Sequence, residues 1–307
     1  MALISKKFSR SNIFQNLENF SFILPALLIF GTFYIFPFYA IFDLSLHEWN
    51  GISLHKTFVG FENFKELFMD QVWWRSMLHA GYITLIALTF QNALAFALAL
   101  ACDREIRMKR FYRAVFFIPP VLSEVVVGMI WTWILHAGVQ DGQQIGLLNY
   151  LLVKTGFPQM VNGWMSNPRT ALTCIALVHS WKGFGWGFIM FLAGLQTIDH
   201  QLYEAARVDG AGAWSAFRHV TVPMMLPVIV VVMILTILGS MQVFVLILTM
   251  SGQGLGYHTE VPVTRILVAM QGNNRYGYAC AMGVTFGVIL VVFSKLMDSV
   301  AKRMRQV

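Results

Sequence analysis

One polar stretch between two long apolar segments holds the residue types and the spacing from which a function can be argued. It contains Tyr203, Glu204-Ala205-Ala206, Arg207, Asp209 and Gly210, and it ends at Val220-Thr221-Val222-Pro223. Its acids, arginine and helix-forming alanines favour an ordered, charged element. The pattern favours a docking surface for another protein. The alternative interpretation is an ordinary amphipathic loop packed on lipid headgroups.

Local sequence signals predict a helix, a turn and a second short helix in this stretch. The carboxylate of Asp199 can accept the first free amides of a helix, in which Glu204 can pair with Arg207. Gly210 supplies the backbone angle that a tight turn needs. The second helix should cover about Ala213–His219 and lead into the next apolar segment. Four residues give the first helix an apolar side: Leu202, Ala205, Ala206 and Val208.

Two ionisable residues, Glu124 and Lys182, lie inside apolar segments. Charged groups in a membrane are costly and by default mark a functional site. They either pair with each other or snorkel as structural residues, or they line a translocation path. Aromatic and polar side chains in the same segments are further candidates, although membrane aromatics are most often packing residues or interfacial anchors. They are Trp131, Trp133, Trp181, Trp186, Gln242, Ser240 and Asn92.

No arrangement of residues for catalysis or metal binding stands out. The eight histidines are dispersed, and the three cysteines, Cys102, Cys174 and Cys280, are far apart and favour packing over a redox or metal role. Lys56-Thr57 and Lys154-Thr155 lack the preceding glycine of a phosphate-binding loop. We therefore expect no enzyme activity, no metal and no ATP site in this chain, and an energy source in a partner.

The elements that must position these residues are membrane spans. Of the 307 residues, 57% are hydrophobic and only 12% are charged, against about 25% charged residues in ordinary soluble domains. A span needs about 20 mostly apolar residues. Six segments qualify: roughly Phe20–Phe42, Leu78–Ala101, Ala114–His136, Ala171–Leu195, Met224–Met250 and Tyr276–Met297. We predict an all-α integral membrane protein with six transmembrane helices.

Lysine and arginine counts predict the orientation of the chain. The side with both termini and the polar stretch carries fourteen of these residues, and the opposite side carries seven. Because basic residues accumulate in cytoplasmic loops, we expect the N-terminal tail (1–19), the loop at about 199–223 and the C-terminal end in the cytoplasm. The net charge of +7 follows from this distribution and does not indicate nucleic acid. On the opposite side, the run Ile145–Leu152 is too short to cross and should form an interfacial helix.

Prolines interrupt several of the expected spans. They are Pro25 and Pro37 in the first, Pro119 and Pro120 in the third, and Pro223 and Pro227 at the start of the fifth. We interpret them as bends at the membrane entry rather than as hinges, since membrane helices tolerate proline where neighbours satisfy the freed carbonyls. No internal repeat is evident, which disfavours a two-fold secondary transporter.

The polar stretch resembles the signature of the permease subunits of bacterial binding-protein-dependent ABC importers. That signature is Glu-Ala-Ala, three residues, Gly, nine residues, and Ile-x-Leu-Pro. Here Glu204-Ala205-Ala206, Gly210 and Val220-x-Val222-Pro223 keep every spacing, with valine at the Ile and Leu positions. Nearly the whole chain is similar to the sugar-importing branch, of the maltose and glycerol-phosphate permease-like, first-subunit type. Gly252-Gln253-Gly254 departs from the Gly-Gly-Pro of that branch.

The resemblance implies a fold, a coupling element and a set of partners. The fold is that of a type I ABC importer permease, a single domain over residues 1–307 with core spans at about 78–297. The partners are a second homologous permease, two cytoplasmic ATPases that bind ATP and magnesium, an extracytoplasmic sugar-binding protein and membrane lipid, in the bacterial inner membrane. The residues implied to dock on the ATPase are Glu204, Ala205, Ala206, Asp209, Gly210 and Pro223.

The resemblance also gives the residues within the spans a possible substrate. Aromatic residues such as Trp131 and Trp181 could stack on sugar faces, and Gln242 could pair with sugar hydroxyls. An anionic sugar derivative would be one reason for Lys182, and the sequence leaves the choice between a neutral and an anionic sugar open. The alternative function is an ion-coupled secondary transporter of small polar solutes, for which only Glu124 and Lys182 qualify as intramembrane charges.

Overall fold

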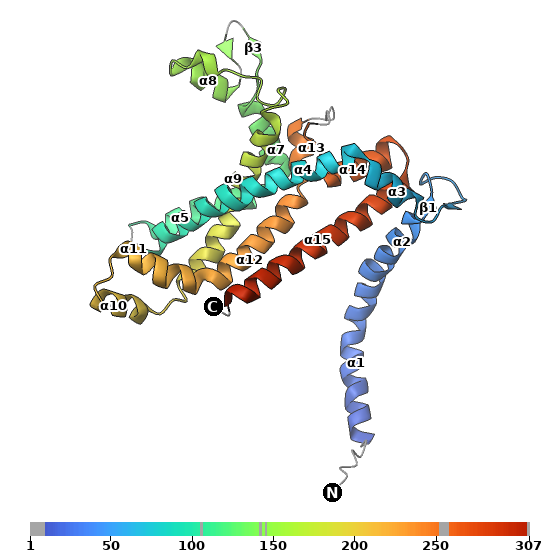
Figure 1. Ribbon diagram of the computed structural model, residues 1–307, viewed down its shortest axis with the longest axis horizontal. Helices are drawn as coiled ribbons and strands as arrows, with labels where there is room; N and C mark the ends of the chain where they lie inside the picture. The colour runs from blue at the N-terminus through green and yellow to red at the C-terminus, as the bar shows by residue number, and fades with distance from the viewer. Residues whose placement is uncertain (1–9, 105–106, 141–142, 145, 252–257, 306–307) are drawn as a thin grey trace. The chain divides into compact units, whose positions relative to one another are not determined.

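The computed structural model describes residues 10–104, 107–140, 143–144, 146–251 and 258–305. Residues 1–9 of the expected N-terminal tail, Ile145 and the Gly252-Gln253-Gly254 departure lie outside the described residues. Figure 1 shows a chain built almost wholly of helices, with two short antiparallel hairpins. Within these described residues, five helices are long and apolar enough to cross a membrane, and a bent helix pair makes a sixth if it counts as one span. The predicted all-α membrane fold is confirmed.

The chain divides into two compact units, which are described separately. Unit 1 is Met1–Phe68 with Ala269–Val284, and unit 2 is Met69–Val268 with Thr285–Val307. The expectation of a single permease domain remains a prediction.

The first span, in unit 1, continues through both of its prolines. It covers Phe20–Ser45 and consists of α1 (Arg10–Phe30), the π-helical turn η1 (Gly31–Ile35) and α2 (Phe36–Ser45). Pro25 lies inside α1, and Pro37 lies just after the π-helical turn η1, through which the helix continues without a break. Neither proline breaks the span.

The rest of unit 1 is held together by contacts of Arg275 with Glu66 and Tyr278. Strands β1 (His47–Glu48) and β2 (Thr57–Phe58) pair antiparallel, and α3 (Glu62–Met69) follows them. Arg275, just before α15 (Tyr276–Arg305), donates two hydrogen bonds to the carboxylate of Glu66 at 2.6 and 2.5 Å. The Arg275 guanidinium also lies 4.4 Å from the ring centroid of Tyr278. A bidentate pair of this kind fixes orientation as well as distance.

Helix α9 (Ala171–Leu195) is the central helix of unit 2, and it has the bounds predicted for the fourth span. It packs against α6 (Lys109–Val121) and α12 (Val222–Met241). It also packs against the long second span, which runs over Gln71–Asp103 as α4 (Gln71–Ile86), η2 (Ala87–Gln91) and α5 (Asn92–Asp103). Large buried side chains of α9, such as Phe188, meet small ones of α5, such as Ala95 and Ala99. Small residues at such contacts let membrane helices approach closely.

The third predicted span, over Ala114–His136, is present as two helices joined at a sharp bend. Helix α6 (Lys109–Val121) and helix α7 (Glu124–Ile134) meet at an angle of 94°. Pro119 and Pro120 lie in the last turn of α6 and remove two N–H donors, which weakens the helix at this point. After α6, Leu122 has an extended backbone and Ser123 is not helical, and a new helix starts at Glu124.

The fifth span begins and ends earlier than the predicted Met224–Met250. It covers Ala213–Met241 and joins α11 (Ala213–Ala216), η4 (Phe217–Thr221) and α12 (Val222–Met241). The segment expected as a separate short helix is therefore the first part of the span. The Val222 N–H donates to the carbonyl of Phe217 five residues back, and this π turn leads into Pro223 in the first turn of α12. Gln242 ends α12, and α13 (Val245–Ser251) is a new helix.

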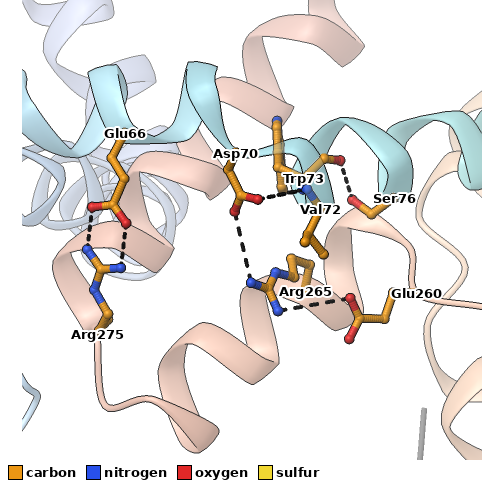
Figure 2. A network of polar contacts seen from close by, with 8 residues as sticks. All are labelled: Glu66, Asp70, Val72, Trp73, Ser76, Glu260, Arg265 and Arg275. Carbon is orange, nitrogen blue, oxygen red and sulfur yellow. Dashed lines mark hydrogen bonds and ion pairs between the residues drawn. The ribbon is translucent and has the colours of Figure 1, made fainter. Parts of the chain in front are cut away.

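An ionic network ties the start of α4 to α14 (Pro262–Leu267) within unit 2 (Figure 2). The Asp70 carboxylate caps α4 by accepting from the Val72 and Trp73 amides. Its other oxygen lies 3.9 Å from Arg265, which lies 4.0 Å from the Glu260 carboxylate. All three charged side chains are largely buried. The π-helical turn η5 (Val268–Gly272) follows α14.

The predicted helix between spans three and four is present as α8 (Leu147–Lys154), after the hairpin of β3 (Val139–Gln140) and β4 (Gln143–Gln144). The side chain of Asn149 is fully buried and holds this segment together. Its amide donates to the Asn162 carbonyl at 3.0 Å, and its oxygen accepts from the Trp164 indole at 2.8 Å. Leu147, Tyr150 and Leu151 are exposed, which gives α8 an uncovered apolar side.

Candidate functional site: an exposed helix and a polar cavity

The polar stretch folds into α10 (His200–Val208), with both ends closed by the residues predicted to close them. The Asp199 carboxylate accepts from the Gln201 amide at 2.9 Å. At the other end, the Gly210 N–H donates to the Arg207 carbonyl, and the Ala211 N–H donates to the Ala206 carbonyl. These two bonds are the Schellman arrangement, which needs a left-handed residue after the helix. Gly210 fills that position with a φ of +78°.

Helix α10 exposes most of its surface. None of its residues is buried, and Val208 is 88% exposed. Glu204 and Arg207 are both exposed, and no ion pair joins them in the structure, so the predicted pairing is absent. Only Tyr203 and Ala206 are half-buried, and the Tyr203 hydroxyl lies 3.0 Å from the Thr221 hydroxyl in η4. One side of the helix therefore contacts the start of the fifth span, and its other sides are exposed.

A cavity of about 330 Å³, with both apolar and polar lining residues, lies between η2, α7, α9 and α12 in unit 2. Its polar and aromatic lining includes Gln91, Glu124, His179, Lys182, Trp186, Thr236 and Ser240. The break before α7 places Glu124 at the first position of that helix. Its carboxylate lies 3.8 Å from the ammonium of Lys182 on α9. The two charges therefore pair with each other, and both line the cavity.

Gln91 is a buried amide residue at the wall of this cavity. The residue is 7% exposed, and its side-chain oxygen has no partner among the described residues. Gly183 on α9 makes room for it, since a Cβ at that position would lie 2.6 Å from the Gln91 oxygen. Buried polar groups are nearly always paired. The Gln91 oxygen is therefore an unused hydrogen-bond acceptor buried against Gly183, beside the cavity.

Of the other candidate residues from the sequence, Ser240 lines the cavity, whereas Trp131, Trp181 and Gln242 do not. Ser240 lines the cavity, but its hydroxyl already donates to the Thr236 carbonyl at 2.6 Å. Trp131 and Trp181 do not line it and instead pack edge to face, with ring centroids 5.6 Å apart. Gln242 is exposed at the end of α12 and does not line it either.

Sequence reasoning missed Gln91 and His179 as cavity residues. The signal for Gln91 was the amide pair Gln91-Asn92 in the middle of an apolar span, where unpaired amides are costly. Asn92 uses its oxygen to accept from Thr236 at 3.1 Å. The three cysteines are free, and the described residues include no group of three or more His, Cys, Asp or Glu that could hold a metal ion.

Comparison with known proteins shows which protein family the chain resembles. Residues 91–306 match the family model described as binding-protein-dependent transport system inner membrane component. The probable ABC transporter permease protein YurN of Bacillus subtilis is 31% identical over 275 residues, which cover 89% of this chain and 92% of that protein. The diacetylchitobiose uptake system permease protein NgcF of Streptomyces coelicolor is 29% identical over 287 residues, covering 90% of this chain and 80% of that protein.

A solved structure shares the fold. It is a chain of a bacterial alginate ABC transporter in complex with an alginate pentasaccharide-bound periplasmic protein, with a TM-score of 0.80. The match covers 96% of this chain and 97% of that chain at 23% identity, which supports the fold alone.

Proposed function

Because this chain belongs to the family of binding-protein-dependent transport system inner membrane components, we propose that it is the permease subunit of an ATP-driven importer of a sugar or sugar derivative. Family membership makes it a multi-pass membrane transport component rather than an enzyme. It also removes the alternative of an ion-coupled secondary transporter. The match over residues 91–306, which include α10 and the cavity, is the observation that carries the proposal.

The saccharide substrate is supported by relatives and by the cavity. NgcF takes part in diacetylchitobiose uptake by its name. In this chain, the cavity combines an exposed indole at Trp186, the unpaired oxygen of Gln91 and a charged pair that can accept and donate hydrogen bonds. Sugars need such a mixture, because their rings have apolar faces and hydroxyl edges. The cavity is accordingly the proposed substrate path, with a second permease standing opposite and an extracytoplasmic binding protein delivering the solute.

The proposed contact with the ATPase is α10 in the cytoplasm. Exposed Glu204 offers charge to basic groups of the ATPase, and small Ala205 and Ala206 allow close approach. Asp209 and Gly210 end the helix, and Pro223 begins the main part of the fifth span. The hydroxyl contact between Tyr203 and Thr221 joins α10 to that span. Movement of α10 would therefore be transmitted to α12, a wall of the cavity. ATP and magnesium are assigned to the ATPase.

Charge reversal at Glu204 tests this assignment. In the reconstituted transporter, Glu204→Lys should abolish substrate-stimulated ATP hydrolysis and uptake while the subunits still co-purify. Glu62→Lys, the same change on an exposed acid in α3, is the matched control and should retain both activities. Normal uptake in Glu204→Lys would contradict the coupling role. Failure of any ATPase to co-purify with the unaltered chain would contradict the importer itself.

A further inference from the structure

We infer that the cavity selects uncharged solutes, because Glu124 cancels the charge of Lys182 inside it, which makes Glu124 a specificity-determining residue. The inference rests on the proposed function and decides between a neutral and an anionic saccharide. The sequence alone left that choice open.

The cavity lining holds one basic and one acidic side chain. Among its thirteen lining residues, Lys182 and Glu124 are the residues charged at neutral pH, and His179 is the other titratable group. Lysine alone in such a place would attract anions, since a nearby charge acts strongly where water is scarce. With the glutamate beside it, the formal charge of the lining is zero with His179 neutral.

The two charges are close but leave each other's hydrogen-bonding positions free. The distance of 3.8 Å between the Lys182 Nζ and the Glu124 carboxylate is too long for a hydrogen bond. The Lys182 side chain is 16% exposed and that of Glu124 is 43% exposed, so a solute can reach both. A hydroxyl group can donate to the carboxylate and accept from the ammonium. A neutral polyol therefore finds complementary partners at both charges.

An anionic solute is treated differently by the same pair. A carboxylate placed beside Lys182 would also lie close to Glu124, and the repulsion offsets the attraction. The other polar lining residues, such as Gln91 and Thr236, are uncharged, so they can form hydrogen bonds with hydroxyl groups but supply no charge to balance an anion. Both the charge of the lining and its hydrogen-bonding groups therefore favour an uncharged solute that carries hydroxyl groups.

The charge balance can be measured without knowing the natural substrate. In the full transporter, with Cys102, Cys174 and Cys280 replaced by alanine, Leu235→Cys places one thiol on the cavity wall. The probes are a negatively and a positively charged methanethiosulfonate reagent, and the readout is the ratio of their reaction rates. Adding Glu124→Gln should raise the anionic-to-cationic ratio about tenfold, the low end of what one neighbouring charge does to an ionisation equilibrium.

Two single variants, their combination and a control variant distinguish an effect of charge on the reagent ratio from an effect of misfolding. Lys182→Gln should shift the ratio in the opposite direction, and the combination of Glu124→Gln with Lys182→Gln should restore it. Glu62→Gln, outside the cavity lining, is the matched control and should leave it unchanged. An unchanged ratio in Glu124→Gln, or a ratio that the double variant does not restore, would overturn the inference.

A matched pair of solutes connects the charge balance to selection. Equilibrium binding of radiolabelled maltose and maltobionate to the full transporter should favour maltose, and Glu124→Gln should shift the preference towards maltobionate about tenfold. Tighter binding of maltobionate by the unaltered transporter would overturn the selection. Absence of ATP-driven uptake with the expected reagent ratios would instead contradict the proposed function and leave the charge balance standing.

Discussion

Gly210 is the residue on which the shape of the exposed loop depends. Its φ of +78° is in the left-handed region, which side chains with a Cβ rarely adopt. Apart from its own and its neighbours' atoms, no described atom of the chain lies within 4 Å of the place where a Cβ would be, so within this chain the constraint comes from the backbone angle. The two amides that close α10 depend on this angle, because they belong to Gly210 and to the residue after it.

Substitutions at Gly210 should therefore follow backbone preference rather than size. Gly210→Ala should destabilise the end of α10 by about 1 kcal/mol, whereas the larger Gly210→Asn should cost less because asparagine tolerates the left-handed region. Hydrogen exchange of the α10 amides gives the local stability, and substrate-stimulated ATP hydrolysis gives the effect on coupling. Equal effects of alanine and asparagine would show that volume, and not φ, matters at this position.

At the scale of elements, the network of Asp70, Arg265 and Glu260 fixes α14 to the start of α4 (Figure 2). Arg265 stands between two carboxylates, so its removal leaves two negative charges in a largely buried place. Burial raises the pKa of the Glu260 carboxyl, Arg265 lowers it, and Asp70 raises it again. The arginine is the group that makes this acid tolerable in its charged form.

Arg265→Met should lower the stability of the assembled complex by about 3 kcal/mol at neutral pH, as expected when a buried ion pair loses one partner. Without the arginine the pKa of Glu260 rises further, so the folded state favours the protonated acid. Stability of the variant is then greatest below the ordinary carboxyl pKa and falls as the pH rises through the folded-state value. Thermal unfolding of the variant and of the unaltered complex at pH 5 and pH 8 measures this pH dependence of stability. A loss that does not grow with pH, or that Glu260→Gln does not reduce, would contradict the argument.

Some elements could be predicted from the sequence because their causes are local. The Asp199 cap, the Gly210 turn and the bounds of α9 depend on neighbouring residues or on a continuous apolar run. The 94° break between α6 and α7 could not be predicted, because Pro119-Pro120 is compatible with either a bend or a break. The cavity could be predicted only in part, since Glu124 and Lys182 are conspicuous by charge, whereas the place of Gln91 depends on a gap at Gly183 of another helix.

At the scale of the whole molecule, docking of α10 on a cytoplasmic ATPase requires one orientation of the chain. The fourteen basic residues on the side of α10, against seven on the other, predict that orientation. Arg218 in η4 and Glu62 in α3 are exposed residues assigned to opposite sides, and each can be replaced by cysteine in the background without native cysteines. In intact spheroplasts, a membrane-impermeant maleimide should label Glu62→Cys, and it should label Arg218→Cys only after permeabilisation. The reverse pattern would place α10 outside, where no ATPase could reach Glu204, and the coupling assignment would then fail with the orientation.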